Sequence, residues 1–433
     1  MENKEKKQIT KDDILSIVLS IVTILYFFYG FYFNENSAGA GPYDFELIWS
    51  NLQLFKEGIF VNLDNYNYND SRTPLPYIIH ALLNPFTENK LNFRYSVLII
   101  SLLVPILFFF SIKKKYLHVN NSLILLLTSI LTLSPYFRTT SYWGLGENYG
   151  LIFLLSSYLI FSWIKKQDLN RINIKNSLLI LSMCLFSSLC VYFDQKLVFV
   201  PILCLYLIYS IKANLYLKLS TVIYYIIFSL PLLYLIFLWE NILPPSAASS
   251  RSVGQKLFLY HLGYCLTIIA FYVAPLLLIS KSKFFNFKIN FFSRKLLYVG
   301  ILFLFYIIII LLFENFSTLP MLGKGIVHKL LALIIENSSM RLSFTLIAFF
   351  LSAIIVFEYF KNKIDIAFVF YFLILAIVTY PFQQEYLDPL IFLLAFTFFN
   401  TKLIINYKNT YFIFVYFLTF SIISKIYYNL TIV

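Results

Sequence analysis

The sequence predicts an all-α polytopic membrane protein, and three observations predict it. First, 60% of the 433 residues are hydrophobic and only 13% are charged, with a mean hydropathy of +0.78, whereas a soluble globular protein has roughly 25% charged residues. Second, apolar runs of bilayer-spanning length recur along the whole chain. Third, the Lys and Arg residues, which exceed the Asp and Glu residues by 13, gather in alternate loops. A water-soluble enzyme, a disordered chain and a disulfide-bonded scaffold are therefore excluded.

The apolar runs predict about thirteen transmembrane helices, separated by short polar segments. In chain order they cover 13–33, 95–112, 122–136, 148–164, 177–193, 197–211, 219–239, 257–280, 296–313, 341–360, 365–381, 387–401 and 410–428. The predicted organisation is a cytoplasmic N-terminus at 1–12, a transmembrane domain at 13–401, and a last inner loop, helix and short outer tail at 402–433.

The distribution of charge predicts the orientation of these helices. With the N-terminus in the cytoplasm, the inner segments hold 22 of the 34 Lys and Arg residues, as expected for loops that stay on the cytoplasmic side. By the same division, 14 of the 21 Asp and Glu residues fall on the outer side or at outer helix ends. Chemistry that uses carboxylates is therefore expected on the extracytoplasmic face.

The first outer loop, at 34–94, is the longest loop and is predicted to contain two interfacial helices. Apolar residues recur at helical spacing from Phe45 to Phe55, which is typical of a helix that lies flat on a membrane surface. Thr73 followed by Pro74 is a favourable helix start, so a second short helix is expected over 74–84.

The Cys and His residues predict neither disulfides nor a zinc site. The cysteines lie in apolar runs without C-x-x-C spacing, and no two histidines have the spacing of a helical zinc motif. No cofactor is required by the sequence, although a divalent cation bound by carboxylates near Asp44 and Glu46 stays open. The basic excess is explained by topology, so no nucleic-acid partner is expected.

Three short motifs carry a resemblance to a known family. They are Pro42-Tyr43-Asp44-Phe45-Glu46, Thr73-Pro74-Leu75-Pro76-Tyr77-Ile78-Ile79-His80-Ala81-Leu82, and the stretch from Arg138 to Glu147-Asn148. Together with one spanning helix before a long outer loop, they resemble the GT-C glycosyltransferases, integral membrane enzymes that use polyprenyl-phosphate-linked sugars. The resemblance covers about the first 165 residues by motif and the remainder by topology alone.

A fourth motif departs from the family pattern. Gln384-Glu385-Tyr386-Leu387-Asp388-Pro389 is similar to the Arg-Tyr-x-x-Pro element that some members carry late in the chain. Glu385 stands where Arg is usual, which puts a lipid-phosphate role for this element in doubt.

The resemblance implies that a sugar is transferred from a polyprenyl-phosphate donor to a glycan, lipid or protein acceptor. In an inverting transfer a carboxylate removes the proton of the acceptor hydroxyl, and cations stabilise the departing phosphate. The resemblance gives the base role to Asp44, with Glu46 as a second carboxylate. The residues expected to bind substrate or lipid phosphate are Arg138, Glu147, Arg251, Lys256, Arg72, Lys196 and Arg341.

Most of these residues also have a purely structural interpretation. Asp44 can be an N-cap, with Glu46 interacting favourably with the helix dipole. Arg138 can pair with Glu147 beside interfacial aromatic residues. Arg251 and Lys256 can be solvated charges in a loop. Asp194 and Lys196 can pair with each other within a tight turn.

Two further classes of protein compete with the transferase. A transporter or flippase of lipid-linked glycans would place ionisable groups near the bilayer midplane and often has repeated halves. A glycan polymerase or ligase would act on the same substrates with a different arrangement of loops. The predicted location is the same for all three: a multi-pass protein whose active face is extracytoplasmic, at the cell exterior or periplasm, or in the ER lumen in a eukaryote.

Overall fold

The computed structural model describes residues 10–170, 173–250, 256–280, 294–313 and 324–431. These residues form helices, turns and loops, and no strand occurs among them. The all-α prediction is therefore confirmed.

Seven helices are long and apolar enough to cross a bilayer, as counted over the described residues. They are α1 (Lys11–Tyr32), α4 with α5 (Lys90–Ser101 and Leu103–Lys115, together one span), α9 (Ile174–Phe193), α11 (Leu215–Trp239), α13 (His261–Ile279), α16 (Ser338–Tyr359) and α19 (Tyr407–Thr431). An eighth span would be formed by α6 (Asn121–Ile130), η2 (Leu131–Leu133) and α7 (Pro135–Trp143), which bend by 69°. The chain is thus a multi-pass membrane protein, but the predicted count of thirteen spans is not confirmed.

Apart from two helices of the first outer loop described below, the other helices show why the predicted count of thirteen spans is higher than seven. They are η1 (Phe60–Asn62), α8 (Glu147–Ile164), η3 (Gln195–Leu197), α10 (Phe199–Ser210), α12 (Pro245–Ser250), α14 (Arg294–Phe313), α15 (Ile326–Ile334), α17 (Lys363–Val378), η5 (Gln384–Tyr386) and α18 (Leu390–Phe396). Every predicted span contains helix, but 387–401 contains only the seven residues of α18. At 1.5 Å per residue such a helix is about 10 Å long, and a bilayer core is about 30 Å thick.

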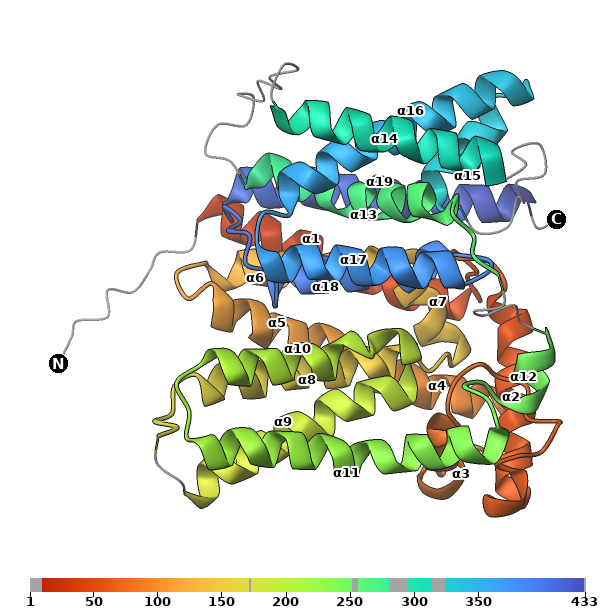
Figure 1. The fold of residues 1–433 in the computed structure, drawn as a ribbon, viewed down its shortest axis with the longest axis vertical. Helices are drawn as coiled ribbons and strands as arrows, with labels where there is room; N and C mark the ends of the chain where they lie inside the picture. Colours follow the sequence, from red (N-terminus) through yellow and green to blue (C-terminus); the bar gives the residue numbers. More distant parts are fainter. Residues whose placement is uncertain (1–9, 171–172, 251–255, 281–293, 314–323, 432–433) are drawn as a thin grey trace.

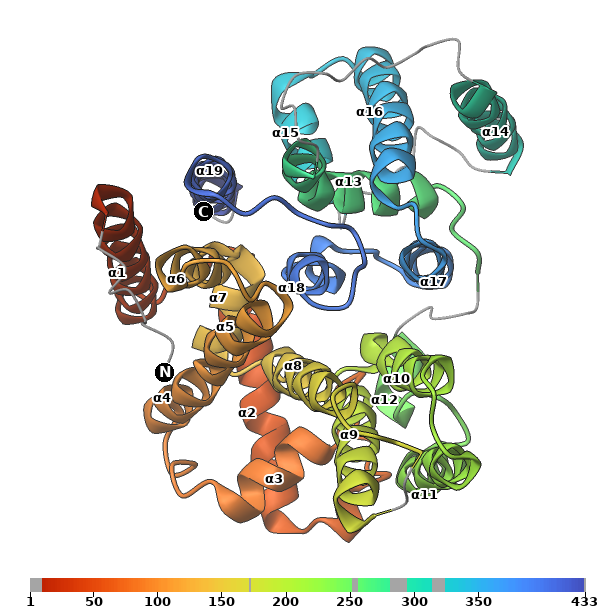
Figure 2. The ribbon, with the colours of Figure 1, turned by 90° about the vertical axis from the view of Figure 1, so that its left-hand side faces the viewer.

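The long helices lie side by side, and the polar loops gather at the two ends of the bundle (Figure 1). At the right-hand end in that view, α2 (Gly41–Glu57) runs across the direction of the long helices, with α3 (Leu75–Leu83) beside it. We call this end the loop end. Figure 2, which looks along the bundle, also shows α2 crossing the helix axes.

The two short helices that were predicted in the first outer loop are present. α2 buries the apolar positions of its predicted face, including Phe45 at 4% exposure and Phe55 at 1%. α3 begins at Leu75, close to the predicted start. Thr73 is not its cap, however, because the Thr73 hydroxyl donates instead to the backbone carbonyl of Tyr192.

Helix α11 lies at the edge of the bundle and is fastened at its end. Only 11% of its most apolar window is buried in the protein. Its last residue, Trp239, is 5% exposed, and the indole Nε1 donates to the carbonyl of Leu63 at 2.7 Å. The first outer loop is thereby connected to a helix that is otherwise mostly peripheral.

Candidate functional site

A polar cavity of about 490 Å³ opens at the loop end of the bundle. Five stretches of chain line it, within 38–51, 69–77, 136–151, 194–196 and 380–390. Most of the lining residues lie in loops or near helix termini at the loop end. The others lie within α2, α7 and α8. The volume falls in the range of small-molecule sites.

The charged groups that line the cavity are mainly acidic. Among the described lining residues, the carboxylates are Asp44, Asp70, Glu147, Asp194, Glu385 and Asp388, and the cations are Arg72 and Lys196. Because the carboxylates outnumber the cations, a bound ligand meets many hydrogen-bond acceptors and few cationic groups.

Asp44 belongs to the first turn of α2 and lines the cavity. The N-cap of α2 is Ala40, whose left-handed φ of 56° turns the chain into the helix, and Pro42 occupies the first turn. The interpretation of Asp44 as an N-cap is therefore wrong, since its own backbone N–H already donates to the Ala40 carbonyl at 2.9 Å. Its half-buried side chain instead belongs to the cavity wall, beside the N-terminus of α2.

Glu46, the predicted second carboxylate, does not line the cavity. Two residues along an α-helix turn the side chain by about 200°, so Glu46 points away from the direction of Asp44. Its side chain is 61% exposed, and its carboxylate pairs with Lys90 Nζ at 2.5 Å. The structure therefore separates the two residues that the sequence motif grouped together.

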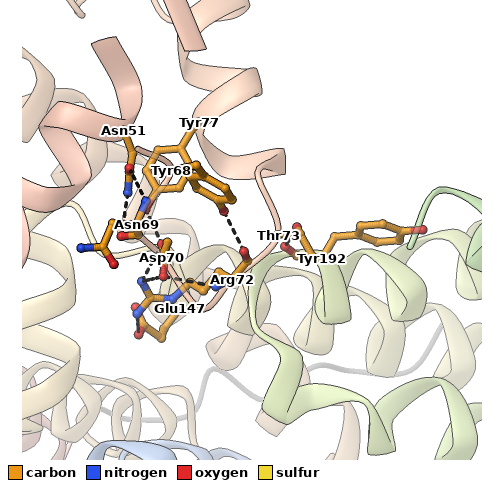
Figure 3. A network of polar contacts seen from close by, with 9 residues as sticks. All are labelled: Asn51, Tyr68, Asn69, Asp70, Arg72, Thr73, Tyr77, Glu147 and Tyr192. Carbon is orange, nitrogen blue, oxygen red and sulfur yellow. Dashed lines mark hydrogen bonds and ion pairs between the residues drawn. The ribbon is translucent and has the colours of Figure 1, made fainter. Parts of the chain in front are cut away.

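The loop that carries Arg72 is fastened on both sides (Figure 3). On one side, the Asn51 side chain of α2 exchanges two hydrogen bonds with the backbone of Asn69, each 3.2 Å long. On the other side, Thr73 bonds to the backbone at the end of α9 through Tyr192. Arg72 is thus held at the cavity wall between α2 and α9.

Arg72 joins two carboxylates in the cavity (Figure 3). Its Nη1 lies 3.2 Å from Asp70 Oδ2, and its Nη2 pairs with Glu147 Oε1 at the start of α8. The Tyr77 hydroxyl donates to Asp70, and the Tyr68 hydroxyl donates to the Arg72 carbonyl at 2.7 Å. The second oxygen of Glu147, Oε2, is buried and has no hydrogen-bond partner among the described residues. A ligand hydroxyl in the cavity could supply that partner.

Asp194 and Lys196 form the neighbouring pair that was considered from the sequence, with Nζ 3.0 Å from Oδ2. Both residues also line the cavity, so the pair is part of the site. Lys196 Nζ lies 3.3 Å from the Glu385 carbonyl and donates to it, which connects η3 to the late-chain element.

The late-chain element contributes two carboxylates that were not among the predicted site residues. Burial, together with the nearby carboxylates of Glu147 and Asp44, raises the pKa of Glu385 to about 7 against the opposing effect of Lys196. Asp388 is 5% exposed and accepts hydrogen bonds from Ser134 Oγ at 2.8 Å and from a backbone N–H at 3.3 Å. The signal in the sequence was the motif resemblance at 384–389, which the substitution of Glu for Arg obscured.

Arg138 lies outside the cavity. Its side chain is fully buried and forms two hydrogen bonds of 2.7 Å with the carboxylate of Glu35. The alternative pairing of Arg138 with Glu147 is wrong, because each has a different partner. Arg138 therefore fastens α7 to the chain that follows α1, and it is not placed to bind a phosphate in the cavity.

Of the other predicted phosphate ligands, the structure describes Lys256 and Arg341 and does not describe Arg251. Lys256 is exposed, and Arg341 lies half-buried in the first turns of α16; neither lines the cavity. Of the predicted ligands that the structure describes, the cavity therefore contains Arg72, Lys196 and Glu147.

No group of three or more His, Cys, Asp or Glu side chains is arranged to hold a metal ion in the part of the chain that the structure describes. No family model, no curated protein and no solved structure matches this chain.

Proposed function

We propose that this protein is a membrane glycosyltransferase of the GT-C type, in which Asp44 is the general base. The observation that carries the proposal is the position of Asp44. It lies in the first turn of a helix that crosses the end of the bundle, on the wall of a polar cavity of about 490 Å³.

The cavity contains groups suited to sugar transfer. A carboxylate at Asp44 can accept the proton of an acceptor hydroxyl as that hydroxyl attacks the anomeric carbon. The unpartnered oxygen of Glu147 is suited to accept a hydrogen bond from a sugar hydroxyl. Among the described lining residues, Arg72 and Lys196 are the cations available to stabilise the leaving phosphate. The sugar is thus bound by carboxylates, and the phosphate by the cationic part of the wall.

The position of the charges favours an enzyme over a transporter. A transporter commonly binds its substrate near the bilayer midplane, at broken helices. Here the acidic and basic lining residues lie in loops or close to helix ends at one end of the bundle. On the predicted topology this end is extracytoplasmic, where polyprenyl-phosphate sugars would be the donors.

The test is to compare Asp44→Asn with Glu46→Gln, two matched changes on the same helix turn. Transfer from radiolabelled polyprenyl-phosphate sugars is measured in membranes that contain equal amounts of each variant. We expect Asp44→Asn to lower the rate by about 10²–10⁴-fold, as loss of a general base does, and Glu46→Gln to retain it. Full activity of Asp44→Asn would remove Asp44 from the mechanism.

A further inference from the structure

The polar cavity carries a surplus of negative charge. Its described lining contains six carboxylates and two cationic side chains. Both cations are already paired with carboxylates of the same wall. Arg72 pairs with Asp70 and Glu147, and Lys196 lies 3.0 Å from Asp194. A ligand that enters the cavity therefore meets more negative than positive charge, and the positive charge is already engaged.

The carboxyl group of Glu385 responds to this surplus. Burial is the largest cause that raises its pKa to about 7, and the nearby carboxylates of Glu147 and Asp44 raise it further, against the opposing effect of Lys196. A positive group on a ligand would reduce the repulsion among these carboxylates, whereas a neutral ligand would leave it unchanged.

Thr139 of α7 brings an unused hydroxyl to the same wall. The residue is 3% exposed, it lines the cavity, and its Oγ1 has no hydrogen-bond partner in the part of the chain that the structure describes. Hydroxyls on helices commonly donate to a carbonyl one turn back, as Ser141 does to Phe137 at 2.7 Å. A buried hydroxyl without such a bond is costly, so we expect a ligand in the cavity to supply the partner of Thr139.

Glu147 brings a second unused oxygen, from the start of α8 (Figure 3). Its Oε1 pairs with Arg72, while its buried Oε2 has no partner among the described residues. An ammonium group has three N–H donors and no acceptor, so it matches a wall that offers carboxylate and hydroxyl oxygens. Its bond to a carboxylate is also about twice as strong as that of a neutral hydroxyl. It would bind Oε2 without displacing Arg72 from Oε1.

Tyrosine rings complete the wall. The four that line the cavity in the described chain are Tyr77, Tyr136, Tyr380 and Tyr386. The face of an aromatic ring attracts a cation within about 6 Å of its centre. Lys196 already uses one of these faces, since its Nζ lies 5.8 Å from the centre of the Tyr386 ring. Carboxylates and aromatic faces together favour an organic cation.

We propose that the polar cavity selects a substrate that carries a primary ammonium group on a polyol, as an amino sugar does, and that Glu147 Oε2 and Thr139 Oγ1 accept its N–H groups. This inference deepens the proposed function and rests on it. The proposed transferase would then act on an amino sugar, either as the group transferred or as the acceptor.

The experiment measures binding without a lipid-linked donor. Purified protein in phosphatidylcholine nanodiscs, whose lipid has no net charge, is titrated at pH 7 with 6-amino-6-deoxyglucose, glucose and 6-acetamido-6-deoxyglucose, and binding is followed by ligand-detected NMR. The three sugars share one ring and differ in carrying an ammonium, a hydroxyl or a neutral amide. Empty nanodiscs give the background.

Four variants locate the ammonium. Glu147→Gln removes the charge and keeps the shape, and Glu46→Gln is its control because Glu46 lies outside the cavity. Thr139→Val removes the unused hydroxyl. Thr140→Val is its control, because the Thr140 hydroxyl is already bonded to Asn148 Oδ1 at 2.8 Å.

We expect wild-type protein to bind the amino sugar about tenfold or more tightly than glucose or the acetamido sugar, since hydrogen bonds to charged groups are strong. Glu147→Gln should abolish most of this preference, and Thr139→Val should reduce it by about threefold or more. Both controls should retain it.

Three results would overturn the inference: no preference for the amino sugar in wild-type protein, an unchanged preference in both Glu147→Gln and Thr139→Val, or an equal loss in Glu46→Gln. Displacement of the amino sugar by Mg²⁺ at a lower concentration than by methylamine would instead assign the carboxylates to a divalent cation. An ammonium preference in a protein that transfers no sugar would reject the proposed function and retain the site, whereas transfer without that preference would do the reverse.

Discussion

The guanidinium of Arg138 donates from Nε and Nη2 to the two carboxylate oxygens of Glu35, and both distances are 2.7 Å. Both side chains are almost completely removed from solvent, at 0% and 4% exposure. Lys425 Nζ, from α19, lies 3.1 Å from the same carboxylate. The three residues therefore fasten α7, the start of the first outer loop and the last helix to one another.

Arg138→Ala is expected to destabilise the protein by about 3–5 kcal/mol, because it leaves the Glu35 carboxylate buried without its main partner. The measurement is denaturant unfolding in detergent. The double variant Glu35→Gln/Arg138→Met should lose less stability than either single change, since it leaves no unpaired charge. If Arg138→Ala unfolds like the wild-type protein and only its transfer rate falls, the pair is not structural.

Cysteine labelling tests the orientation of the bundle. Phe60 is 85% exposed in the first outer loop, and Leu117 is 70% exposed between α5 and α6, at the opposite end. We expect a membrane-impermeant maleimide to label Phe60→Cys from outside the cell and Leu117→Cys only after the membrane is opened. The four native cysteines are buried, so they give little background. The reverse pattern would invert the topology.

The raised pKa of Glu385 predicts that the stability of the protein depends on pH. Its pKa is raised, mainly by burial, from 4.5 to about 7, so the folded protein holds this proton more tightly than the unfolded chain does. The resulting stabilisation is present below about pH 4.5 and is lost as the pH rises to about 7. Glu385→Gln should flatten the melting temperature across this interval, whereas Glu46→Gln, an exposed carboxylate, should not. Parallel curves for wild-type protein and Glu385→Gln would contradict the assignment.

Gly41→Ala is expected to lower the transfer rate by about tenfold or more. A methyl group at Gly41 would lie 2.5 Å from Trp143 Cδ1, and Trp143 is held by a 3.0 Å hydrogen bond from Nε1 to the Glu35 carbonyl. The start of α2 must then shift, and a displacement of about 1 Å at Asp44 is costly to catalysis. Gly58→Ala at the other end of α2 is the control, because its methyl group would approach only Asn62 Nδ2, at 4.0 Å. Equal rates for the two variants would disprove the expected effect.

The local features of this fold could be predicted from the sequence. Apolar runs located every long helix, and the spacing of Phe45 and Phe55 located α2. The number of spans could not be predicted, because composition does not reveal that the helix after Asn121 bends by 69° or that helix in 387–401 lasts only seven residues. The length of an apolar run shows how many consecutive residues are hydrophobic, whereas crossing a bilayer also requires a continuous straight helix.

The candidate site was predictable only where one residue or motif carries the signal. The motif selected Asp44, and this residue lies on the cavity wall. The pairing of Arg138 with Glu35 joins residues 103 positions apart, and that of Ser134 with Asp388 joins residues 254 positions apart. Pairs so distant depend on how the helices pack, which no local pattern encodes.

The bond from Trp239 to the Leu63 carbonyl has a mechanical consequence. Only 11% of the most apolar window of α11 is buried in the protein, so few packing contacts fix the tilt of this helix. Because the end of α11 holds the first outer loop, a change in tilt pulls on the same loop that carries Asp70 and Arg72. We therefore expect a change in the position of α11 to reach the cavity wall through this one bond.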